Sequence, residues 1–151
     1  MKKTSKILTI SSLLFLGFSA LTFTGNLTSQ KPAYAEDLKK CDPEPTDMVI
    51  NYWDRFSCSL NGSGDSDIFR LEGTAGDRII ISVSSSLGSK RVEVIDPKGN
   101  TLDSGDGHGP RFELTLEQTG TYTFVVSTGK VSQYIVEVTC VIGSCLAQSP
   151  Q

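Results

Sequence analysis

From residue 48 onward, apolar and polar side chains alternate along the chain, and the apolar positions recur at every second residue. A period of two is typical of a β-strand with one buried face, because successive side chains of a strand point to opposite faces of the sheet. Val, Ile, Thr, Phe and Tyr fill these segments, as expected for half-buried strands. The pattern predicts strands at Met48–Tyr52, Phe56–Leu60, Asp67–Leu71, Arg78–Ser84, Arg91–Ile95, Arg111–Glu117, Thr121–Ser127 and Ser132–Val141.

Turn signals rich in glycine separate these segments, among them Pro97–Asn100 and the cluster Gly105–Gly109. Short strands at regular spacing, with no segment that looks like a crossover helix, favour antiparallel pairing over a parallel sheet. The sequence therefore predicts an all-β fold, an antiparallel, jelly-roll-like β-sandwich of about eight strands over residues 48–147. A polar tail at residues 36–47 precedes it, and residues 148–151 form a frayed C-terminus.

Residues 1–35 have the features of a secretory signal peptide. Lys2, Lys3 and Lys6 come first, an apolar run from Ile7 to Phe23 follows, and Ala33-Tyr34-Ala35 offers a cleavage site. An uncleaved membrane anchor is the alternative, because the apolar run approaches the length that spans a bilayer. The small residues at the cleavage site favour processing between Ala35 and Glu36, which predicts a secreted, periplasmic or cell-envelope protein.

Removal of this segment changes the charge of the chain. Residues 1–35 contain four of the 14 basic residues and none of the 17 acidic ones, so the mature chain has a net charge of −7. Such a surface repels nucleic acid phosphates and anionic lipid, and we expect neither nucleic acid nor membrane as a partner after cleavage. The acidity is equally compatible with simple solubility.

All four cysteines, Cys41, Cys58, Cys140 and Cys145, follow the predicted cleavage site. An even number in an exported chain predicts two disulfides, and the spacing does not suit the close cysteine pairs of a zinc site. Cys58 and Cys140 share the apolar parity of strands near the two ends of the domain. This favours Cys58–Cys140 with Cys41–Cys145, while the local pairing, Cys41–Cys58 with Cys140–Cys145, stays open.

Four short motifs occur in a fixed order along the chain. They are Asp65-x-Asp67-x-Phe69, Ala75-Gly76 before the strand Ile79–Val83, Asp96-Pro97-x-Gly99, and Gly120-Thr121-Tyr122. Together they resemble the bacterial pre-peptidase C-terminal domain, over roughly residues 56 to 138. The resemblance implies a secreted β-sandwich of the kind often found behind extracellular proteases, with a protein or polysaccharide surface as its ligand. Some members of that family bind calcium.

Asp65 and Asp67 are the candidate metal ligands. They alternate at a strand entry, so both carboxylates are expected on one side, where they could meet a calcium ion. The alternative is that they accept hydrogen bonds from local backbone N–H groups and fix the turn. Asp103 and Asp106 are further acidic positions in loops. No other cofactor is expected.

Tyr52 and Trp53 are the candidate ligand contacts, as an aromatic platform for sugar or peptide, although an aromatic residue beside an apolar strand is often part of the core. His108, the only histidine, lies between glycines, and the chain has no G-x-S-x-G motif. The sequence offers no catalytic constellation. It predicts a secreted, non-catalytic accessory or binding module for a protein or polysaccharide surface. Two alternatives remain, a structural or adhesive envelope protein and a partner or inhibitor of an exported protease.

Overall fold

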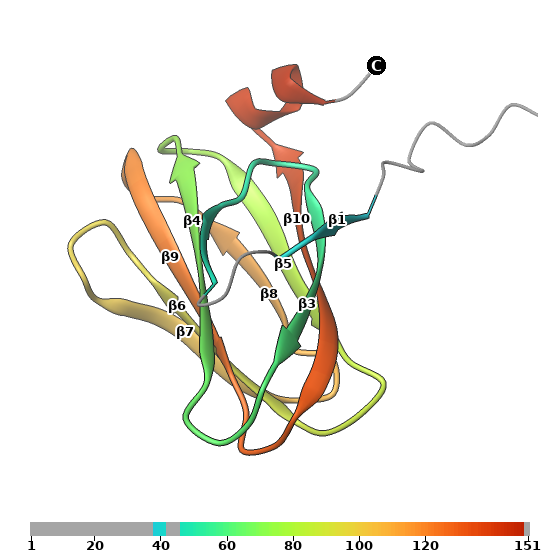
Figure 1. Ribbon diagram of the computed structural model, residues 1–151. Helices are drawn as coiled ribbons and strands as arrows, with labels where there is room; N and C mark the ends of the chain where they lie inside the picture. The colour runs from blue at the N-terminus through green and yellow to red at the C-terminus, as the bar shows by residue number, and fades with distance from the viewer. Residues whose placement is uncertain (1–37, 42–45, 150–151) are drawn as a thin grey trace, which may run out of the picture. The chain divides into compact units, whose positions relative to one another are not determined.

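The computed structural model describes residues 38–41 and 46–149, which contain ten strands and one short helix (Figure 1). The predicted signal peptide, its cleavage site and residues 42–45 and 150–151 lie outside the described residues. The elements are β1 (Lys39–Lys40), β2 (Asp47–Val49), β3 (Arg55–Leu60), β4 (Ser66–Gly73), β5 (Arg78–Ser84), β6 (Lys90–Ile95), β7 (Thr101–Gly107), β8 (Arg111–Thr115), β9 (Gly120–Ser127), β10 (Ser132–Ile142) and the 3₁₀ helix η1 (Ser144–Gln148). No helix in these residues has the length and hydrophobicity to cross a membrane.

The strands form two five-stranded sheets packed face to face (Figure 1). Sheet I has the order β1-β3-β10-β5-β8, and sheet II has the order β2-β4-β9-β6-β7. Between β3 and β10, every connection passes from one sheet to the other except the β6–β7 hairpin. This is the jelly-roll arrangement, in which the first strand pairs with the last and the second with the one before the last. The predicted fold class is confirmed.

The structure adds strands that the sequence pattern did not reveal. β7 lies where no strand was predicted, its last three residues belong to the predicted turn cluster Gly105–Gly109, and its side chains do not alternate between buried and exposed. It forms because it pairs with β6, and Gly105 suits it because a Cβ there would approach Phe112 Cζ at 3.2 Å. β1 and β2 are short and pair in parallel with β3 and β4. Both begin within the predicted polar tail, and the predicted strand Met48–Tyr52 is β2, shorter than expected.

The turn between β6 and β7 shows how a motif fixes local structure. The Asp96 carboxylate accepts hydrogen bonds from Asn100 Nδ2 at 3.0 Å, and from the backbone N–H groups of Asn100 and Lys98, each at 2.8 Å. The Asn100 side chain, helped by these backbone bonds, lowers the pKa of Asp96. Gly99 has a φ of 87°, which is the left-handed conformation that a turn of this type requires. The motif Asp96–Asn100 therefore closes the hairpin between β6 and β7.

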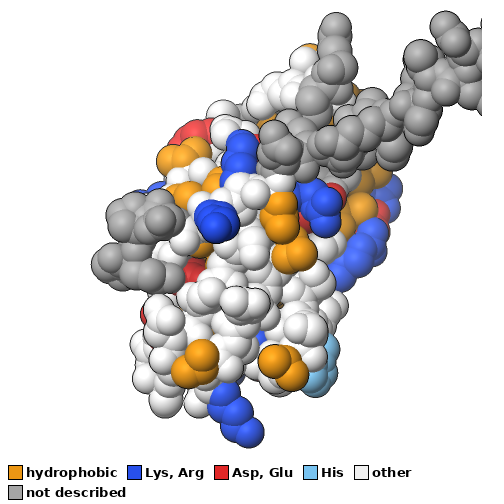
Figure 2. Space-filling view, turned by 45° about the vertical axis from the view of Figure 1, so that its right-hand side comes forward, with side chains coloured by type: hydrophobic (Ala, Val, Ile, Leu, Met, Phe, Trp, Pro, Cys, Tyr) orange, Lys and Arg blue, Asp and Glu red, His pale blue; other side chains and the backbone are white. Residues whose placement is uncertain are grey.

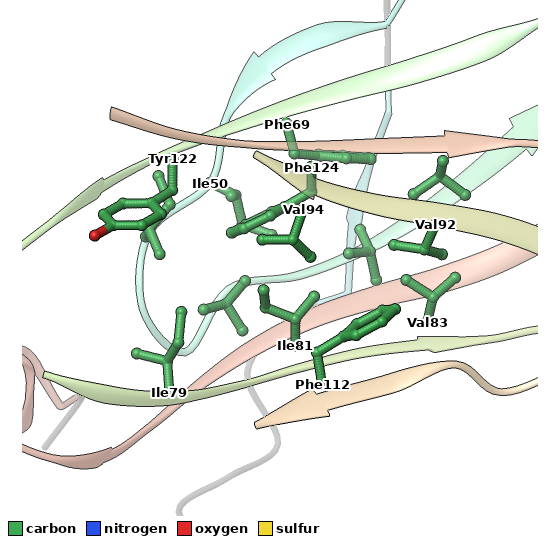
Figure 3. Packing of buried hydrophobic residues seen from close by; sticks show 14 of the residues in the cluster. Ile50, Phe69, Ile79, Ile81, Val83, Val92, Val94, Phe112, Tyr122 and Phe124 are labelled. Atoms are coloured by element: carbon green, nitrogen blue, oxygen red, sulfur yellow. The ribbon is translucent and has the colours of Figure 1, made fainter. Parts of the chain in front are cut away.

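The core consists of the inward-facing positions of both sheets (Figure 3). Phe69, Phe124 and Val94 extend from sheet II toward Ile79, Ile81 and Phe112 of sheet I. Phe56 and Phe69 contact each other across the two layers, with ring centroids 6.4 Å apart. Burial of one such side chain stabilises the fold by about 2–3 kcal/mol, so this interior is the main source of stability. Tyr122 packs its ring here and donates a hydrogen bond from its hydroxyl to Gln118 O at 2.8 Å.

Candidate functional site

Asp65 and Asp67, the predicted metal ligands, do not point to one place. Asp65 lies in the turn before β4, where its Oδ2 accepts a hydrogen bond from Asn61 N at 2.6 Å. Asp67 is 0% exposed, and its Oδ2 accepts a hydrogen bond from the Tyr134 hydroxyl. Asp65 thus fixes a turn, which was the alternative to calcium. Asp67 instead joins β4 of sheet II to β10 of sheet I inside the sandwich, which the sequence did not suggest.

Calcium binding by Asp65 and Asp67 stays a prediction, and the positions of the two carboxylates would have to change for it. Calcium takes about six to eight oxygen ligands, and Asp67 would have to give up Tyr134 and leave the core to supply one. Within residues 38–41 and 46–149, no three His, Cys, Asp or Glu side chains form a group that could hold a metal ion. Asp103, one of the further acidic positions, accepts a hydrogen bond from Ser104 N at 2.8 Å.

Tyr52 and Trp53 do not form an exposed aromatic platform. Tyr52 is only 5% exposed, and its hydroxyl donates a hydrogen bond to Asp77 Oδ2 at 3.0 Å. The ligand contact expected of Tyr52 is therefore corrected, because its ring belongs to the core. Trp53 is half-buried against the core, with a φ of 74° and its backbone N–H bonded to Val138 O at 2.7 Å. A ligand contact through the exposed part of Trp53 stays a prediction.

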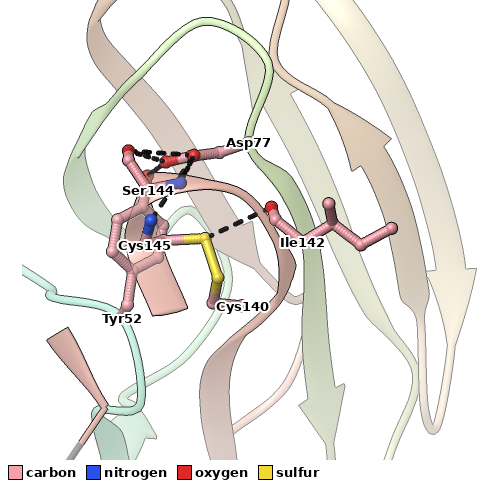
Figure 4. The surroundings of a disulfide bond; sticks show 6 residues. All are labelled: Tyr52, Asp77, Cys140, Ile142, Ser144 and Cys145. Atoms are coloured by element: carbon pink, nitrogen blue, oxygen red, sulfur yellow. Dashed lines mark hydrogen bonds between the residues drawn. A yellow bond between two sulfur atoms is a disulfide. The ribbon is translucent and has the colours of Figure 1, made fainter. Parts of the chain in front are cut away.

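Asp77 is a buried carboxylate that sequence reasoning missed (Figure 4). Besides Tyr52, it accepts hydrogen bonds from Ser144 N at 2.7 Å and from Ser144 Oγ at 3.0 Å. A Cβ at Gly143 would lie 2.2 Å from Asp77 Oδ1, and Gly143 has a φ of 118°, so glycine is required for this close approach. Burial, and then the hydrogen bond and the charge of Asp77, raise the pKa of Tyr52 to about 12. Asp77 thereby fastens η1 to the end of the sandwich.

The disulfides join Cys41 to Cys58 and Cys140 to Cys145, with Cα–Cα distances of 4.9 and 5.7 Å. The favoured long-range pairing was wrong, although both cysteines of β3 and β10 do face inward. The reason is register, since Cys58 lies opposite Tyr134, six residues before Cys140 along β10. At about 3.4 Å per residue, Cys58 and Cys140 are separated by about 20 Å along the strand, far beyond the reach of a disulfide.

A groove of about 330 Å³ crosses the outer face of sheet I near the loops at one end of the sandwich. Its floor comes from three adjacent strands, where Ile135 of β10 lies between Ser57 of β3 and Ser84 of β5 in the pairing register. The full lining is Ser57, Ser84, Ser85, Ser86, His108, Gln133, Tyr134 and Ile135. No lysine, arginine or carboxylate side chain contributes to it. Among the sequence patterns, only the serine-rich stretch Ser82–Ser86 lies in this region.

Lys90, the first residue of β6, lies beneath the loop that borders this groove. It is 0% exposed, and its burial lowers the pKa of the ammonium group. Its Nζ donates hydrogen bonds to Ser85 Oγ at 3.0 Å, Leu87 O at 3.0 Å and Gly88 O at 3.2 Å. Three oxygens match the three donors of an ammonium group, which is the condition for burying this charge. The loop Ser85–Ser89 is therefore wrapped around a buried cation.

The same loop is bonded to the neighbouring loop Thr128–Val131. Thr128 Oγ1 donates a hydrogen bond to Ser89 O at 3.1 Å, and Ser85 Oγ donates one to Gln133 O at 2.8 Å. Each loop exposes one large aliphatic side chain, since Leu87 is 70% and Val131 is 73% exposed. Figure 2 shows separate hydrophobic groups at this end of the molecule, near the histidine and a basic side chain. We call these two loops the apolar loop pair.

The groove lacks the hydrogen bonds between a nucleophile, a base and an orienting group that nucleophilic catalysis needs. A serine nucleophile requires a base within hydrogen-bond reach and a group that orients the base. In the part of the chain that the structure describes, the His108 side chain has no hydrogen bond or ion pair with any serine or carboxylate. What the groove does offer is hydroxyl, amide and imidazole groups around an aliphatic floor, an arrangement suited to binding.

These features define the class of the protein as a disulfide-bonded jelly-roll module with surface loops and a polar groove. Residues 65–128 match the family model of the bacterial pre-peptidase C-terminal domain, and the resemblance predicted from the sequence is confirmed. No curated protein matches the chain significantly in sequence.

Solved structures share the fold at low sequence identity. The pre-peptidase C-terminal domain of a Bacillus anthracis collagenase has a TM-score of 0.50 and 20% identity, covering 65% of this chain and 100% of that one. Aeromonas hydrophila PliG, a periplasmic inhibitor of g-type lysozyme, has a TM-score of 0.52 and 16% identity, covering 64% and 99%. CorA, a surface-associated copper-binding protein of Methylomicrobium album BG8, has a TM-score of 0.51 and 9% identity, covering 64% and 98%. At these identities the likeness concerns the fold alone.

Proposed function

We propose that the mature chain is a non-catalytic binding module that acts outside the cytoplasm and recognises the surface of a protein partner. The family domain, the two disulfides and the sequence features of a signal peptide support an extracytoplasmic location. A partner or inhibitor of an exported hydrolase is the finer version of this proposal. The g-type lysozyme inhibitor among the structural neighbours supports hydrolases as the first targets to test.

The observation that carries the proposal is the apolar loop pair. Leu87 and Val131 are the most exposed of the large hydrophobic side chains in the described residues. Single exposed aliphatic residues need no explanation, but these two lie on loops that hydrogen bonds join to each other and to buried Lys90. A fixed surface loses little conformational entropy when it binds, so this end of the molecule is prepared for contact.

The chemistry of the loop pair favours a protein over a lipid surface. A bilayer interface is normally anchored by tryptophan or tyrosine, and neither occurs in these loops. Anionic lipid also repels a chain with a net charge of −7. The loops themselves carry Lys130 and no carboxylate, so the matching partner surface is an apolar recess with acidic side chains around it.

The test measures binding of mature protein to purified g-type lysozyme and to exported proteases by surface plasmon resonance. We expect Leu87→Ser combined with Val131→Ser to weaken binding at least about tenfold, because the apolar contact is lost. Val49→Ser is the matched control, since Val49 on β2 is also a highly exposed valine, at 61%. Equal loss in both variants, or retention of the protein only on cell-wall material, would favour the structural or adhesive alternative.

A further inference from the structure

The groove on sheet I has properties that the proposed protein contact does not use. Its floor presents Ser57, Ile135 and Ser84 side by side, on strands whose neighbours are about 4.8 Å apart. The two serines are thus about 10 Å apart on either side of an aliphatic residue. Gln133 lies two residues before Ile135 on β10, and His108 lies at the rim of the groove.

Its polar side chains are available to a ligand. Within the described residues, Ser57, Ser84, Ser86, Gln133 and His108 make no side-chain hydrogen bond to the protein. These groups are therefore free to bond to solvent, and a ligand rich in hydroxyl groups would replace those hydrogen bonds without loss. Serine and glutamine side chains both donate and accept, which suits the mixed character of a hydroxyl partner.

The lining also excludes other classes of ligand. With no lysine, arginine or carboxylate side chain in the groove, a phosphate, a metal ion or a charged peptide side chain finds no ion pair. At the floor of the groove an extended peptide cannot add as a strand, because Ser57 pairs with Lys40 and Ile135, and Ile135 also pairs with Ser84. On the other side of Ser84, the backbone N–H groups of Val83 and Ser85 are bonded to Pro110 O and His108 O. A purely apolar ligand would leave the hydroxyls of Ser57 and Ser84 and the amide of Gln133 without hydrogen-bond partners. A ring with hydroxyl groups at its edge and C–H groups on its face fits both the polar rim and Ile135.

The groove is also held in shape without a ligand. Its floor belongs to a regular sheet, and its rim residue Ser85 is bonded to buried Lys90 and to Gln133 O. Binding sites on rigid elements position their polar groups accurately. We infer that this groove is a binding site for a neutral oligosaccharide, with Ser57, Ser84 and Gln133 as hydrogen-bonding residues and Ile135 as the apolar contact.

The test is an NMR titration of the ¹⁵N-labelled mature chain with chitotriose, cellotriose and maltotriose, and with the acidic trigalacturonate for comparison. We expect saturable shifts from at least one neutral trisaccharide, confined to the groove residues, with a Kd of about 0.1–10 mM typical of an open polar site. Ser84→Ala with Gln133→Ala should weaken this binding at least about tenfold, because two hydrogen bonds are lost.

Ser82→Ala is the matched control, because Ser82 lies on the same strand and the same face, two residues outside the groove, and its loss should leave the affinity unchanged. The inference is overturned if no neutral trisaccharide gives saturable shifts at about 20 mM, if the shifts map elsewhere, or if Ser82→Ala weakens binding as much as the groove variant. Cleavage of a bound trisaccharide would instead contradict the proposed non-catalytic function while leaving the site in place. The protein contact at Leu87 and Val131 is tested separately, since neither side chain lines the groove.

Discussion

Three buried polar residues hold separate parts of this sandwich in place. Asp67 links the two sheets through Tyr134, Asp77 fastens η1, and Lys90 organises the loop Ser85–Ser89. Their burial could be predicted from parity, because Asp67 shares the inward parity of Phe69, and Lys90 that of Val92. Their partners could not be predicted, since hydrogen bonds such as Asp67–Tyr134 join residues far apart in the sequence.

The contact between Tyr52 and Asp77 makes stability depend on pH in the alkaline range. The pKa of Tyr52 is raised to about 12 in the folded state from 10.0, so the folded protein holds this proton more tightly than the unfolded chain. The resulting stabilisation is complete below about pH 10 and is lost as the pH rises toward 12, by about 2–3 kcal/mol in total. Urea unfolding of the native protein and Tyr52→Phe at pH 8, 10 and 11 measures this.

Tyr52→Phe removes the titrating group, and the native protein should lose stability relative to this variant only above about pH 10. Other tyrosines and lysines affect both proteins alike, so the difference between the two curves isolates Tyr52. A difference that stays constant from pH 8 to 11 would show that Tyr52 titrates normally.

At the level of elements, the period of two located most of the strands but not their register. Parity correctly placed Cys58 and Cys140 on the inward face, yet it carries no information on which residues lie opposite each other. The edge strand β7 escaped prediction for a related reason. Both of its faces are largely exposed, so no alternation marks it, and only its pairing with β6 makes it a strand.

Because both disulfides are local, we expect their reduction to lower the free energy of unfolding only moderately. In the chain-entropy model, Cys41–Cys58, with a separation of 17 residues, stabilises by about 3 kcal/mol, and Cys140–Cys145, with a separation of five, by about 2 kcal/mol. We expect the double variants Cys41→Ala/Cys58→Ala and Cys140→Ala/Cys145→Ala to lose these amounts in urea unfolding and to keep the fold. Peptide mapping without reductant provides the check, and a cross-link between the Cys58 and Cys140 peptides would contradict the structure.

On the scale of the whole molecule, the apolar loop pair and the contacts that fasten η1 lie at opposite ends of the sandwich. The loop that carries Leu87 leads into β6, and the loop with Val131 leads into β10, while η1 follows the far end of β10 (Figure 1). The disulfide Cys140–Cys145 and the Asp77 contacts stabilise that far end. Changes to the apolar loop pair should therefore leave the end fastened by Asp77 and Cys140–Cys145 intact, so that the variants proposed above report on binding and not on folding.

Export connects the processing site with the folded state. We expect the exported protein to begin at Glu36, because Ala33-Tyr34-Ala35 offers the small residues that a signal peptidase reads. Cleavage there leaves only three residues before β1. Lys39 of β1 forms an ion pair with Asp54, and Cys41, directly after β1, is bonded to Cys58. Both bridges require an oxidising compartment, so processing and disulfide formation should occur together.

Intact-mass analysis of protein from the culture medium or envelope should thus give residues 36–151 with no free thiol. Residues 36–151 produced in the cytoplasm should contain four thiols and be less stable by up to about 5 kcal/mol, the sum for the two bridges. Recovery of the chain from Met1 in the membrane fraction, or of four free thiols in the exported form, would contradict this prediction.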